Sequence, residues 1–471
     1  MSTVQASFNV LSTEQINDIH NYSLKILQET GVKTSSSIAM KLFKLRSDVS
    51  VVDDRVYFSK EVIDWALSVA PKNIDIVNRN GEAAFSLNTN DPSTKFGVGV
   101  TNLNYQNPID DSITEFQAKH VNIAAGLAEE LTGYDLLSTP GVIKDVSTKK
   151  ADLVCTAKML ASTKKPLLLL VSDEDQFGKV LDLVDNVSAN IDKPSSMVYL
   201  NPITPLVIND DTVEKMQIAI DRNFPVIYSN YGMYGASAPI TAASCLALLN
   251  AELLAGLVLS QLLKEGAPVV LGSLPAGFDM LSMSSIYTTQ SMLLNAACAE
   301  MMQYYKIPHA GTSGSGIGWR GDVLSGNMLW MNHMTSVLGK SGMAPFVGGN
   351  FDSMVFSPEM VVYSDFIINE SRKLKQAFEI NDETVRTDEI KSIGSGGNFL
   401  TSELTLMNMS MDVNSNPIWP NMNLEQWQEQ DKPVAETRLK ERTIELINNL
   451  QEDLEIKEKC LEFIGVELEN K

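Results

Sequence analysis

The sequence predicts an α/β protein, a (β/α)8 TIM barrel with an N-terminal helical extension and a C-terminal helical cap. From residue 95 onward, eight short apolar runs alternate with longer segments of helical periodicity. Continuous apolar runs separated by helices are typical of parallel strands that are buried on both faces. The repeating region spans about 250–280 residues, which is the size expected of a closed barrel of eight such units.

The eight apolar runs are the expected strands, and several of them begin at a proline, where no ladder hydrogen bond is lost. They are residues 95–100, 135–139, 166–172, 197–201, 225–230, 268–273, 308–312 and 345–349. Segments 212–223 and 242–264 are two of the helices expected between them. A doubly wound open sheet is the alternative architecture. It would carry a phosphate-binding glycine motif after its first strand, and none follows Val100.

The chain is expected to divide into an extension at 1–94, the barrel at 95–376 and a C-terminal cap at 377–471. In the extension, Ser12-Thr-Glu-Gln15 predicts the start of a helix, and Asp53-Asp54 predicts a hairpin turn between two short strands. In the cap, a polar stretch and a glycine cluster at 394–398 precede a helix expected from about Pro433 to Val466.

Composition limits the classes of function. The 471 residues are 44% hydrophobic and 20% charged, as in an ordinary soluble globular protein. The net charge of −21 argues against nucleic-acid binding, which requires a basic surface. Four cysteines without a C-x-x-C pair are expected to be buried reduced thiols, and four scattered histidines do not predict a metal site.

The sequence predicts a cytoplasmic protein that does not contact a membrane. The first ten residues lack the basic and apolar regions of a secretory signal. The most apolar segment, 242–263, contains Asn250, Glu252 and Gln261, so a buried helix is expected there rather than a membrane span.

In TIM barrels the reacting groups lie at the C-terminal ends of the strands and in the loops that follow. Here these positions carry amides, hydroxyls and aromatic rings, with little charge. Since no lysine ends a strand, Schiff-base chemistry is not supported, and no carboxylate pair predicts glycoside hydrolysis. The candidate substrate-binding residues are Tyr105, Asn201, Asn230, Tyr231, His309, Thr312, Asn332, His333, Asn350 and Phe351.

Each of these candidates also has a structural interpretation. Asn201 and Asn230 suit caps of the helices that follow, and the aromatic rings suit packing. His309, inside the seventh strand, and His333, on the next helix, suit satisfied core histidines.

A glycine-rich segment follows the seventh strand, at 311–321. Gly316-Ile-Gly-Trp-Arg-Gly321 formally matches G-x-G-x-x-G, but it does not open a mononucleotide-binding unit, so nucleotide binding is not favoured. Glycine permits close approach of the backbone to a ligand or to a flat cofactor.

Three motifs resemble the trimethylamine methyltransferase family. They are Tyr304-Tyr-Lys-Ile-Pro-His-Ala-Gly-Thr-Ser-Gly-Ser-Gly316, Gly348-Gly-Asn350 and Gly394-Ser-Gly-Gly-Asn-Phe-Leu400. Archaeal trimethylamine-specific members carry pyrrolysine in a loop at the barrel mouth, whereas residues 313–319 here are ordinary amino acids. The chain therefore resembles the branch without pyrrolysine.

Within that branch, three further motifs are most similar to the glycine betaine:corrinoid enzymes. They are Tyr228-Ser-Asn-Tyr-Gly-Met-Tyr234, Trp330-Met-Asn-His333 and Pro345-Phe-Val-Gly-Gly-Asn-Phe-Asp352. The resemblance implies transfer of a methyl group from a quaternary amine, with glycine betaine the favoured donor, to Co(I) of a corrinoid (cobalamin) carried by a separate protein. It also implies a homo-oligomer and no metal bound by the chain itself.

The resemblance assigns roles to the candidates. A quaternary ammonium leaves as a neutral amine, so no catalytic acid or base is expected. Tyr105, Tyr231 and Phe351 are expected to hold the cation by cation–π attraction, and His333, Asn332 or Thr312 to donate to the carboxylate of a betaine. The residues expected near the corrinoid are Gly311, Ser313, Gly314, Gly316 and Arg320.

Two alternatives remain at this stage. One is a barrel lyase or isomerase with His309 or His333 as general base. The other is a non-catalytic betaine-binding protein, since a barrel by itself fixes no function.

Overall fold

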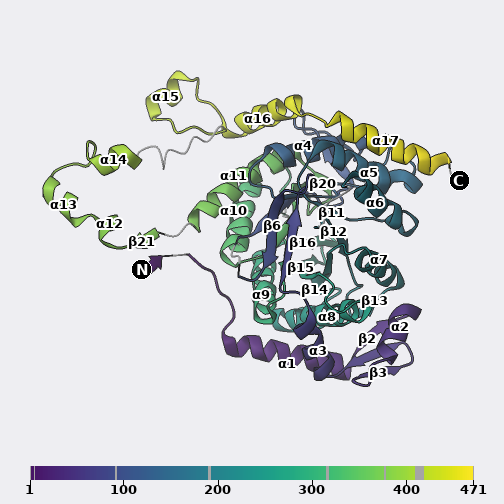
Figure 1. Ribbon diagram of the computed structural model, residues 1–471. Helices are drawn as coiled ribbons and strands as arrows, with labels where there is room; N and C mark the ends of the chain where they lie inside the picture. Colours follow the sequence, from purple (N-terminus) through teal and green to yellow (C-terminus); the bar gives the residue numbers. More distant parts are fainter. Residues whose placement is uncertain are drawn as a thin grey trace.

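The chain folds around a closed barrel of eight parallel strands, so the predicted (β/α)8 TIM barrel is confirmed (Figure 1). The computed structural model describes residues 2–4, 6–90, 93–188, 193–314, 318–375, 378–408 and 418–469. The barrel strands are β7 (Lys95–Val98), β10 (Leu136–Ser138), β11 (Leu167–Leu169), β12 (Ser196–Leu200), β14 (Val226–Tyr234), β15 (Val269–Asp279), β17 (His309–Ala310) and β18 (Met343–Val347). Each predicted strand overlaps one of them.

Each barrel strand lies beside the next one along the chain, and β18 closes the ring against β7, with Ala344 opposite Phe96. The longest pairing is between β14 and β15, from Val226 opposite Val269 to Tyr234 opposite Gly277. Both strands continue past the ends expected from the sequence. The barrel wall is therefore extended on this side of its C-terminal end, which we call the mouth.

Helices follow the barrel strands and surround the barrel. They are α4 (Ala118–Glu130), α5 (Thr148–Ser162), α6 (Glu174–Val187), α7 (Asp210–Asp221), α8 (Ala242–Leu263), α9 (Thr289–Tyr305), α10 (Val323–Leu338) and α11 (Pro358–Leu374). Among the described residues, α8 alone is long and apolar enough to cross a membrane, but 83% of its most apolar window is buried inside the protein. This is the location of a core helix, as the sequence predicted.

The inside of the barrel is filled with apolar side chains, and its N-terminal end is closed by a hairpin. The filling residues are Leu136, Leu168, Met197, Tyr199, Ile227, Val270, Ala310, Met343 and Phe346. The hairpin of β5 (Asn73–Val77) and β6 (Ala83–Asn88) adds Ile76 and Leu87 to the same cluster. The Val77 N–H donates to the Pro194 carbonyl, just before β12, and holds the hairpin under the barrel.

The N-terminal segment forms a small layer under α8. Its elements are α1 (Thr13–Glu29), β2 (Val32–Thr34), α2 (Ser37–Lys44), β3 (Val49–Val52), β4 (Arg55–Phe58) and α3 (Lys60–Val69). The Ser12 hydroxyl accepts from the Gln15 N–H, and the Gln15 side chain accepts from the Ser12 N–H, so the predicted helix start is confirmed as a capping box. The predicted hairpin is confirmed as β3 and β4.

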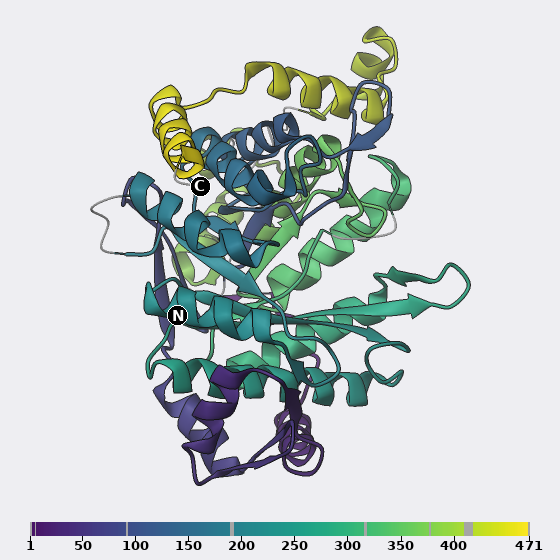
Figure 2. The ribbon, with the colours of Figure 1, turned by 90° about the vertical axis from the view of Figure 1, so that its right-hand side faces the viewer.

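Two structures project around the mouth. A small sheet is formed by β8 (Asn104–Gln106), β9 (Ile113–Glu115), β19 (Gly349–Asn350) and β20 (Val355–Phe356). The end of β15 forms a hairpin with β16 (Ser284–Ile286), which projects from the body at the right of Figure 2. Met280, Leu281 and Met283 at the tip of this hairpin are exposed. The short β13 (Val207–Ile208) instead joins β2 in the N-terminal layer.

The C-terminal segment is only partly seated on the barrel, and its long helix is divided in two. α16 (Ala435–Asn449) contacts α11 and α4, and α17 (Leu454–Glu469) contacts α5 and α6. Before them, β21 (Phe378–Ile380) pairs with β1 (Ser2–Val4), and α12 (Asp382–Val385), α13 (Thr387–Ile393), α14 (Glu403–Asn408) and α15 (Leu424–Glu429) follow it. These elements lie away from the barrel in Figure 1.

Candidate functional site at the barrel mouth

A cavity of about 210 Å³ opens at the mouth, on the side of the extended β14 and β15. It is smaller than the ~300–1,000 Å³ sites that take drug-sized ligands, so it suits a small molecule. Its lining residues are Val100, Tyr231, Leu274, Pro275, Ala276, Tyr287, Thr312, Phe346, Asp352 and Ser353. Among these described residues, Asp352 is the only charged side chain, and three of the others are aromatic.

Asp352 is held in a strained turn after the last barrel strand. Phe351, Asp352 and Ser353 all have left-handed backbone conformations, with φ of 51°, 53° and 69°. Such conformations are uncommon for non-glycine residues and cluster at functional sites. The Asp352 carboxylate accepts a hydrogen bond from the Ser285 hydroxyl of β16, in the projecting hairpin. Burial raises the pKa of Asp352, and the Ser285 hydrogen bond opposes that shift.

The aromatic side chains reach the cavity from three different elements. Tyr231 comes from β14 and is 39% exposed, Tyr287 precedes α9 and is buried, and Phe346 comes from β18. Burial raises the pKa of the Tyr231 and Tyr287 hydroxyls, and the Asp352 charge adds to both shifts. Both tyrosines therefore remain neutral at physiological pH, and their rings offer electron-rich faces to a cation.

Thr312 is fixed in the cavity wall by its backbone. Its N–H donates to the Asn295 side-chain oxygen at 3.0 Å, and its carbonyl accepts from the Asn295 amide at 3.2 Å. The carbonyl also accepts from the Ser336 hydroxyl of α10. Because three hydrogen bonds hold the main chain, the Thr312 side chain is well placed to meet a ligand.

The glycine-rich segment forms the rim of the mouth next to Thr312. Gly314 has a φ of +85°, and a Cβ added there would meet the Val347 backbone at 2.9 Å. A residue with a side chain is therefore excluded both by conformation and by space. Ser313, beside it, is buried and shares a 2.6 Å hydrogen bond with Nδ1 of His333. The predicted Gly316 lies outside the described residues.

The far end of this rim is tied to the small sheet over the mouth. The Phe351 N–H donates to the Gly318 carbonyl at 2.9 Å, and the Gln106 amide donates to the Trp319 carbonyl at 3.0 Å. The buried Asn350 completes the link, because its amide donates to the Gln106 oxygen at 2.8 Å. Asn350 thus braces the rim rather than facing the cavity.

Arg320 points away from the cavity. Its guanidinium lies 3.6 Å from the Asp111 carboxylate, and Lys440 of α16 lies 2.8 Å from the same carboxylate. Lys440 is also 3.9 Å from the buried Glu359, whose pKa burial raises to about 7. This cluster connects the rim to the C-terminal helix.

A second, more polar cavity of about 240 Å³ lies at the ends of β11 and β12. Its lining includes Asn201, whose amide donates to the Ser229 carbonyl. It also includes the buried Lys215, which is paired with Asp211 at 2.8 Å. The ring of Tyr199, which lines this cavity, contacts the ring of Phe346 edge-on with a centroid separation of 5.0 Å. The two cavities are thus neighbours across one aromatic pair.

The structure brings Tyr231 and Thr312 to the first cavity. Phe351 directly precedes Asp352 and is 40% exposed, and the other candidates lie elsewhere. Alternation along a strand explains two exceptions. Ala310 and Ile227 point into the barrel, so His309 and Asn230, on the same strands, point outward. Asn230 donates to Glu252 of α8 at 2.7 Å, and His309 lies 3.4 Å from the Ser341 hydroxyl.

The remaining candidates are packed in the core. Tyr105 stacks on His120 with a centroid distance of 3.8 Å. Asn332 and His333 are buried on α10, and the Gly311 backbone is close to Asn295. Burial lowers the pKa of both His309 and His333 to about 3. Neither imidazole lines the cavity, so neither faces a substrate there as a base.

Asp352, Tyr287 and Phe346 are cavity residues that the candidate set lacks. Asp352 directly follows the candidate Phe351, in the loop after the last predicted strand. This position at the barrel mouth could have identified it from the sequence. Tyr287 lies in a loop that follows a projecting hairpin, and no periodicity identifies it. In the described part of the chain, no three His, Cys, Asp or Glu side chains gather as a metal site.

Comparisons with known proteins agree with this architecture. Trimethylamine methyltransferase MttB of Desulfitobacterium hafniense (strain DSM 10664 / DCB-2) is 24% identical over 445 residues, covering 93% of this chain and 89% of that protein. Glycine betaine methyltransferase of D. hafniense (strain Y51) is 24% identical over 423 residues, covering 87% and 86%. The crystal structure of the Methanosarcina barkeri monomethylamine methyltransferase (MtmB) covers 95% of this chain with a TM-score of 0.57 and 10% identity, which shows a shared fold.

The family model described as trimethylamine methyltransferase (MTTB) matches residues 2–465, almost the whole length of the chain. The first two relatives named above are methyltransferases, and their similarity covers 93% and 87% of this chain. The protein therefore belongs to the trimethylamine methyltransferase (MTTB) family.

Proposed function

We propose that this protein transfers a methyl group from a quaternary amine, with glycine betaine the favoured donor, to Co(I) of a corrinoid carried by a partner protein. The observation that carries the proposal is the small cavity at the mouth, where Tyr231, Tyr287 and Phe346 surround a site next to Asp352. Aromatic faces together with a carboxylate are the usual means of holding a methylated ammonium ion.

The residues of this chain position the donor. The three rings attract the ammonium group, and Asp352 adds a negative charge where burial leaves little water to screen it. The hydroxyls of Thr312 and Ser353 line the same cavity and offer hydrogen bonds to the carboxylate of a betaine. Because the leaving group is a neutral amine, the chain needs no acid or base. Its contribution is orientation and electrostatic complementarity.

The mouth also suits a large flat cofactor on a docked carrier. The Gly314 position leaves no room for a side chain, because an added Cβ would meet the Val347 backbone, so this part of the rim stays closely packed. Trp319, Met280 and Leu281 are exposed around the opening, as expected where another protein covers it. The corrinoid, when its carrier is docked, would supply Co(I) as the methyl acceptor. Ser313 and Gly314 are buried, so the role that we assign to them is to hold the shape of the rim that the corrinoid approaches.

The state of the cysteines indicates the compartment in which the protein is located. The four cysteines at 155, 245, 298 and 460 are free and buried, as is typical of proteins in a reducing compartment. We therefore propose that the protein is cytoplasmic and meets its carrier protein there.

The alternatives receive less support from the geometry. A lyase that uses His309 or His333 as a base needs one of them in the cavity, and both are buried outside it. A betaine-binding protein without activity needs the same cavity, so only an assay of methyl transfer separates it from the enzyme.

A donor panel tests the proposal. The purified protein is mixed with Co(I) cobalamin and with glycine betaine, choline, carnitine, trimethylamine or tetramethylammonium, and the Co(I) absorbance is followed. We expect rapid loss of this absorbance with glycine betaine. If the Co(I) absorbance is lost only with another quaternary amine, the choice of glycine betaine as donor is wrong. No loss with any donor, with binding still seen by calorimetry, would favour the binding protein.

A further inference from the structure

Residues 378–408, which we call the arm, pair with β1 at their start and are otherwise little covered by the described residues. The arm runs from β21 through α12, α13 and α14, away from the barrel, at the left of Figure 1. None of its 31 residues is buried. Its exposed large apolar side chains are Phe378, Ile380, Val385, Ile390, Phe399, Leu400, Leu406 and Met407. A stable monomer rarely leaves such a series of apolar residues in water.

The apolar area of the arm has the size of a protein interface. Leu400 is 77% exposed, Met407 68% and Phe378 62%. Together the exposed apolar residues of the arm present on the order of 800 Å², if a large apolar side chain has an area of ~150–250 Å². This is about the share that one partner contributes to a stable protein–protein interface.

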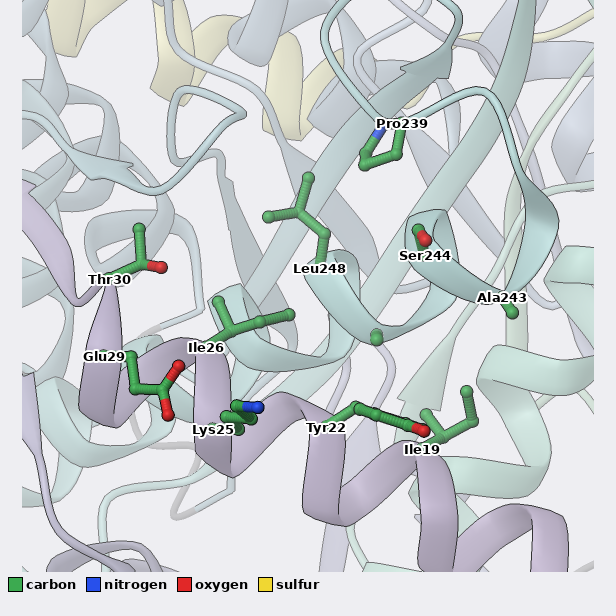
Figure 3. Close-up of a pocket in the computed structure, with 11 residues that line it drawn as sticks. Ile19, Tyr22, Lys25, Ile26, Glu29, Thr30, Pro239, Ala243, Ser244 and Leu248 are labelled. Atoms are coloured by element: carbon green, nitrogen blue, oxygen red, sulfur yellow. The ribbon is translucent and has the colours of Figure 1, made fainter.

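The same chain has an uncovered apolar trough between α1 and α8. Figure 3 shows the side chains that line its larger part, a cavity of about 490 Å³ that includes Ile19, Tyr22, Ile26 and Leu248. A neighbouring cavity of about 320 Å³ shares Ile19 and Tyr22 and continues the trough toward Val10. Tyr22, at the junction of the two cavities, is 61% exposed.

The root of the arm is linked to the trough by the N-terminal residues. β21 pairs with β1, with Val4 opposite Phe378, and the chain from β1 leads directly into α1. The Val10 and Leu11 N–H groups each donate to the Glu300 carboxylate at 2.8 Å, which fixes this connection against α9. One chain therefore carries both an apolar arm and an apolar trough, and the arm extends away from the trough in Figure 1.

We propose that the arm of one copy of this chain lies in the α1/α8 trough of a second copy. A symmetric assembly uses the same pair of surfaces twice, so each arm and each trough is covered at once. The apolar area estimated above is sufficient for such an interface. The proposal is independent of the methyl donor, because neither surface includes a residue of the mouth cavity.

Light scattering after size-exclusion chromatography tests the proposal. It measures the mass in solution of the wild type and of three single variants. Leu400→Asp changes the arm, Tyr22→Asp changes the trough, and Leu45→Asp is the matched control, since Leu45 is 75% exposed and belongs to neither surface. We expect the wild type and the control to be oligomers, and the arm and trough variants each to dissociate at concentrations at least tenfold higher than the wild type. Donor binding at the mouth is expected to remain in all four proteins.

A cross-linking experiment identifies the contact itself. Leu400→Cys and Tyr22→Cys are prepared separately, mixed and treated with a short bismaleimide. The four native cysteines are buried, so background reaction is low. We expect a covalent dimer in the mixture and little in either variant alone. A monomeric wild type, or an oligomer that survives both charge substitutions without this cross-link, overturns the proposal. So does a Leu400→Asp variant that keeps its mass but no longer transfers methyl groups to the carrier protein, since the arm would then serve that partner.

Discussion

The Ser313 hydroxyl and Nδ1 of His333 lie 2.6 Å apart, in the core beneath the rim of the mouth. The bond ties the glycine-rich segment to α10, and the His333 ring packs edge-on against Phe96 of the first barrel strand. The histidine therefore supports the rim from below rather than contacting the donor. A neutral imidazole suits this place, since burial lowers the pKa of His333 to about 3.

The buried His333 predicts a loss of stability in acid. The unfolded chain binds a proton at this site near pH 6.5, whereas the folded chain binds it near pH 3. Between these values the unfolded state holds more protons, so the free energy of unfolding falls as the pH falls, by up to ~1.4 kcal/mol per pH unit. His309 contributes in the same direction. Urea unfolding from pH 7 to pH 5 is expected to show a shallower pH dependence for His333→Gln than for the wild type.

Ser313→Ala is the control for this experiment, because it removes the hydrogen bond but keeps the titrating imidazole. It is expected to lower stability at every pH by ~0.5–1.5 kcal/mol with the slope of the wild type. An unchanged slope in His333→Gln would show that this histidine is not held neutral in the folded protein.

Asp352→Asn is expected to weaken the binding of tetramethylammonium and choline by roughly tenfold, because a half-buried carboxylate next to a cation contributes on the order of 1–2 kcal/mol. Glycine betaine is expected to lose less, since its own carboxylate is relieved of a like charge. Calorimetric titration of the three ligands measures both effects. The matched control is Asp53→Asn, in the distant β3–β4 hairpin, because Asp53 has the same φ of 53° and asparagine also adopts this conformation. Equal losses for all three ligands would contradict the assigned role of Asp352.

Tyr231→Phe is expected to keep donor affinity within about twofold, whereas Tyr231→Leu is expected to lower it about five- to tenfold. The reason is that the face of the ring, rather than the hydroxyl, attracts the cation, with a contribution of ~1 kcal/mol or more. Donor Kd by calorimetry and the KM for methyl transfer are the measurements. If Tyr231→Phe and Tyr231→Leu have the same donor affinity, the contact is not of the cation–π type.

Gly314→Ala is expected to reduce methyl transfer to Co(I) cobalamin by more than tenfold while donor binding changes little. The added methyl meets the Val347 backbone and distorts the rim, whereas the cavity lining is untouched. Gly266→Ala is the matched control, since Gly266 has a similar φ of +80° but open space around its Cβ position. The Gly266→Ala variant has the same backbone strain as Gly314→Ala. Its rate of methyl transfer is expected to match that of the wild type. Equal effects of the two variants on transfer would attribute the loss to strain alone.

The barrel was predictable from the sequence because each of its strands is a continuous apolar run between helical segments. The strand limits were predicted less well where β14 and β15 extend beyond Asn230 and Ser273, because the two strands continue to pair with each other past the residues expected to end them. The capping box at Ser12 and the hairpin at Asp53-Asp54 were predictable because their hydrogen bonds and turn are local in the sequence.

The cavity was only partly predictable. The ends of barrel strands identify the mouth, but a shift of one residue along a strand moves a side chain from the inside of the barrel to the helix layer. Tyr231 and Thr312 point inward, whereas Asn230 and His309, one and three residues earlier, point outward. Tyr287 reaches the cavity from a loop whose path depends on the β15–β16 hairpin. The arm was expected to be part of a cap on the barrel, since its polar stretch and glycine cluster do not reveal what the segment contacts.

The β5–β6 hairpin has a consequence for the order of events in turnover. It fills the N-terminal end of the barrel, so among the described residues the cavity opens at the mouth. In the proposed function, the donor and the carrier protein therefore use the same opening. The amine product then leaves, and the next donor enters, through the mouth while no carrier protein is docked there. At saturating donor, the rate of carrier departure sets an upper limit on turnover, and an excess of carrier that blocks the opening slows the enzyme.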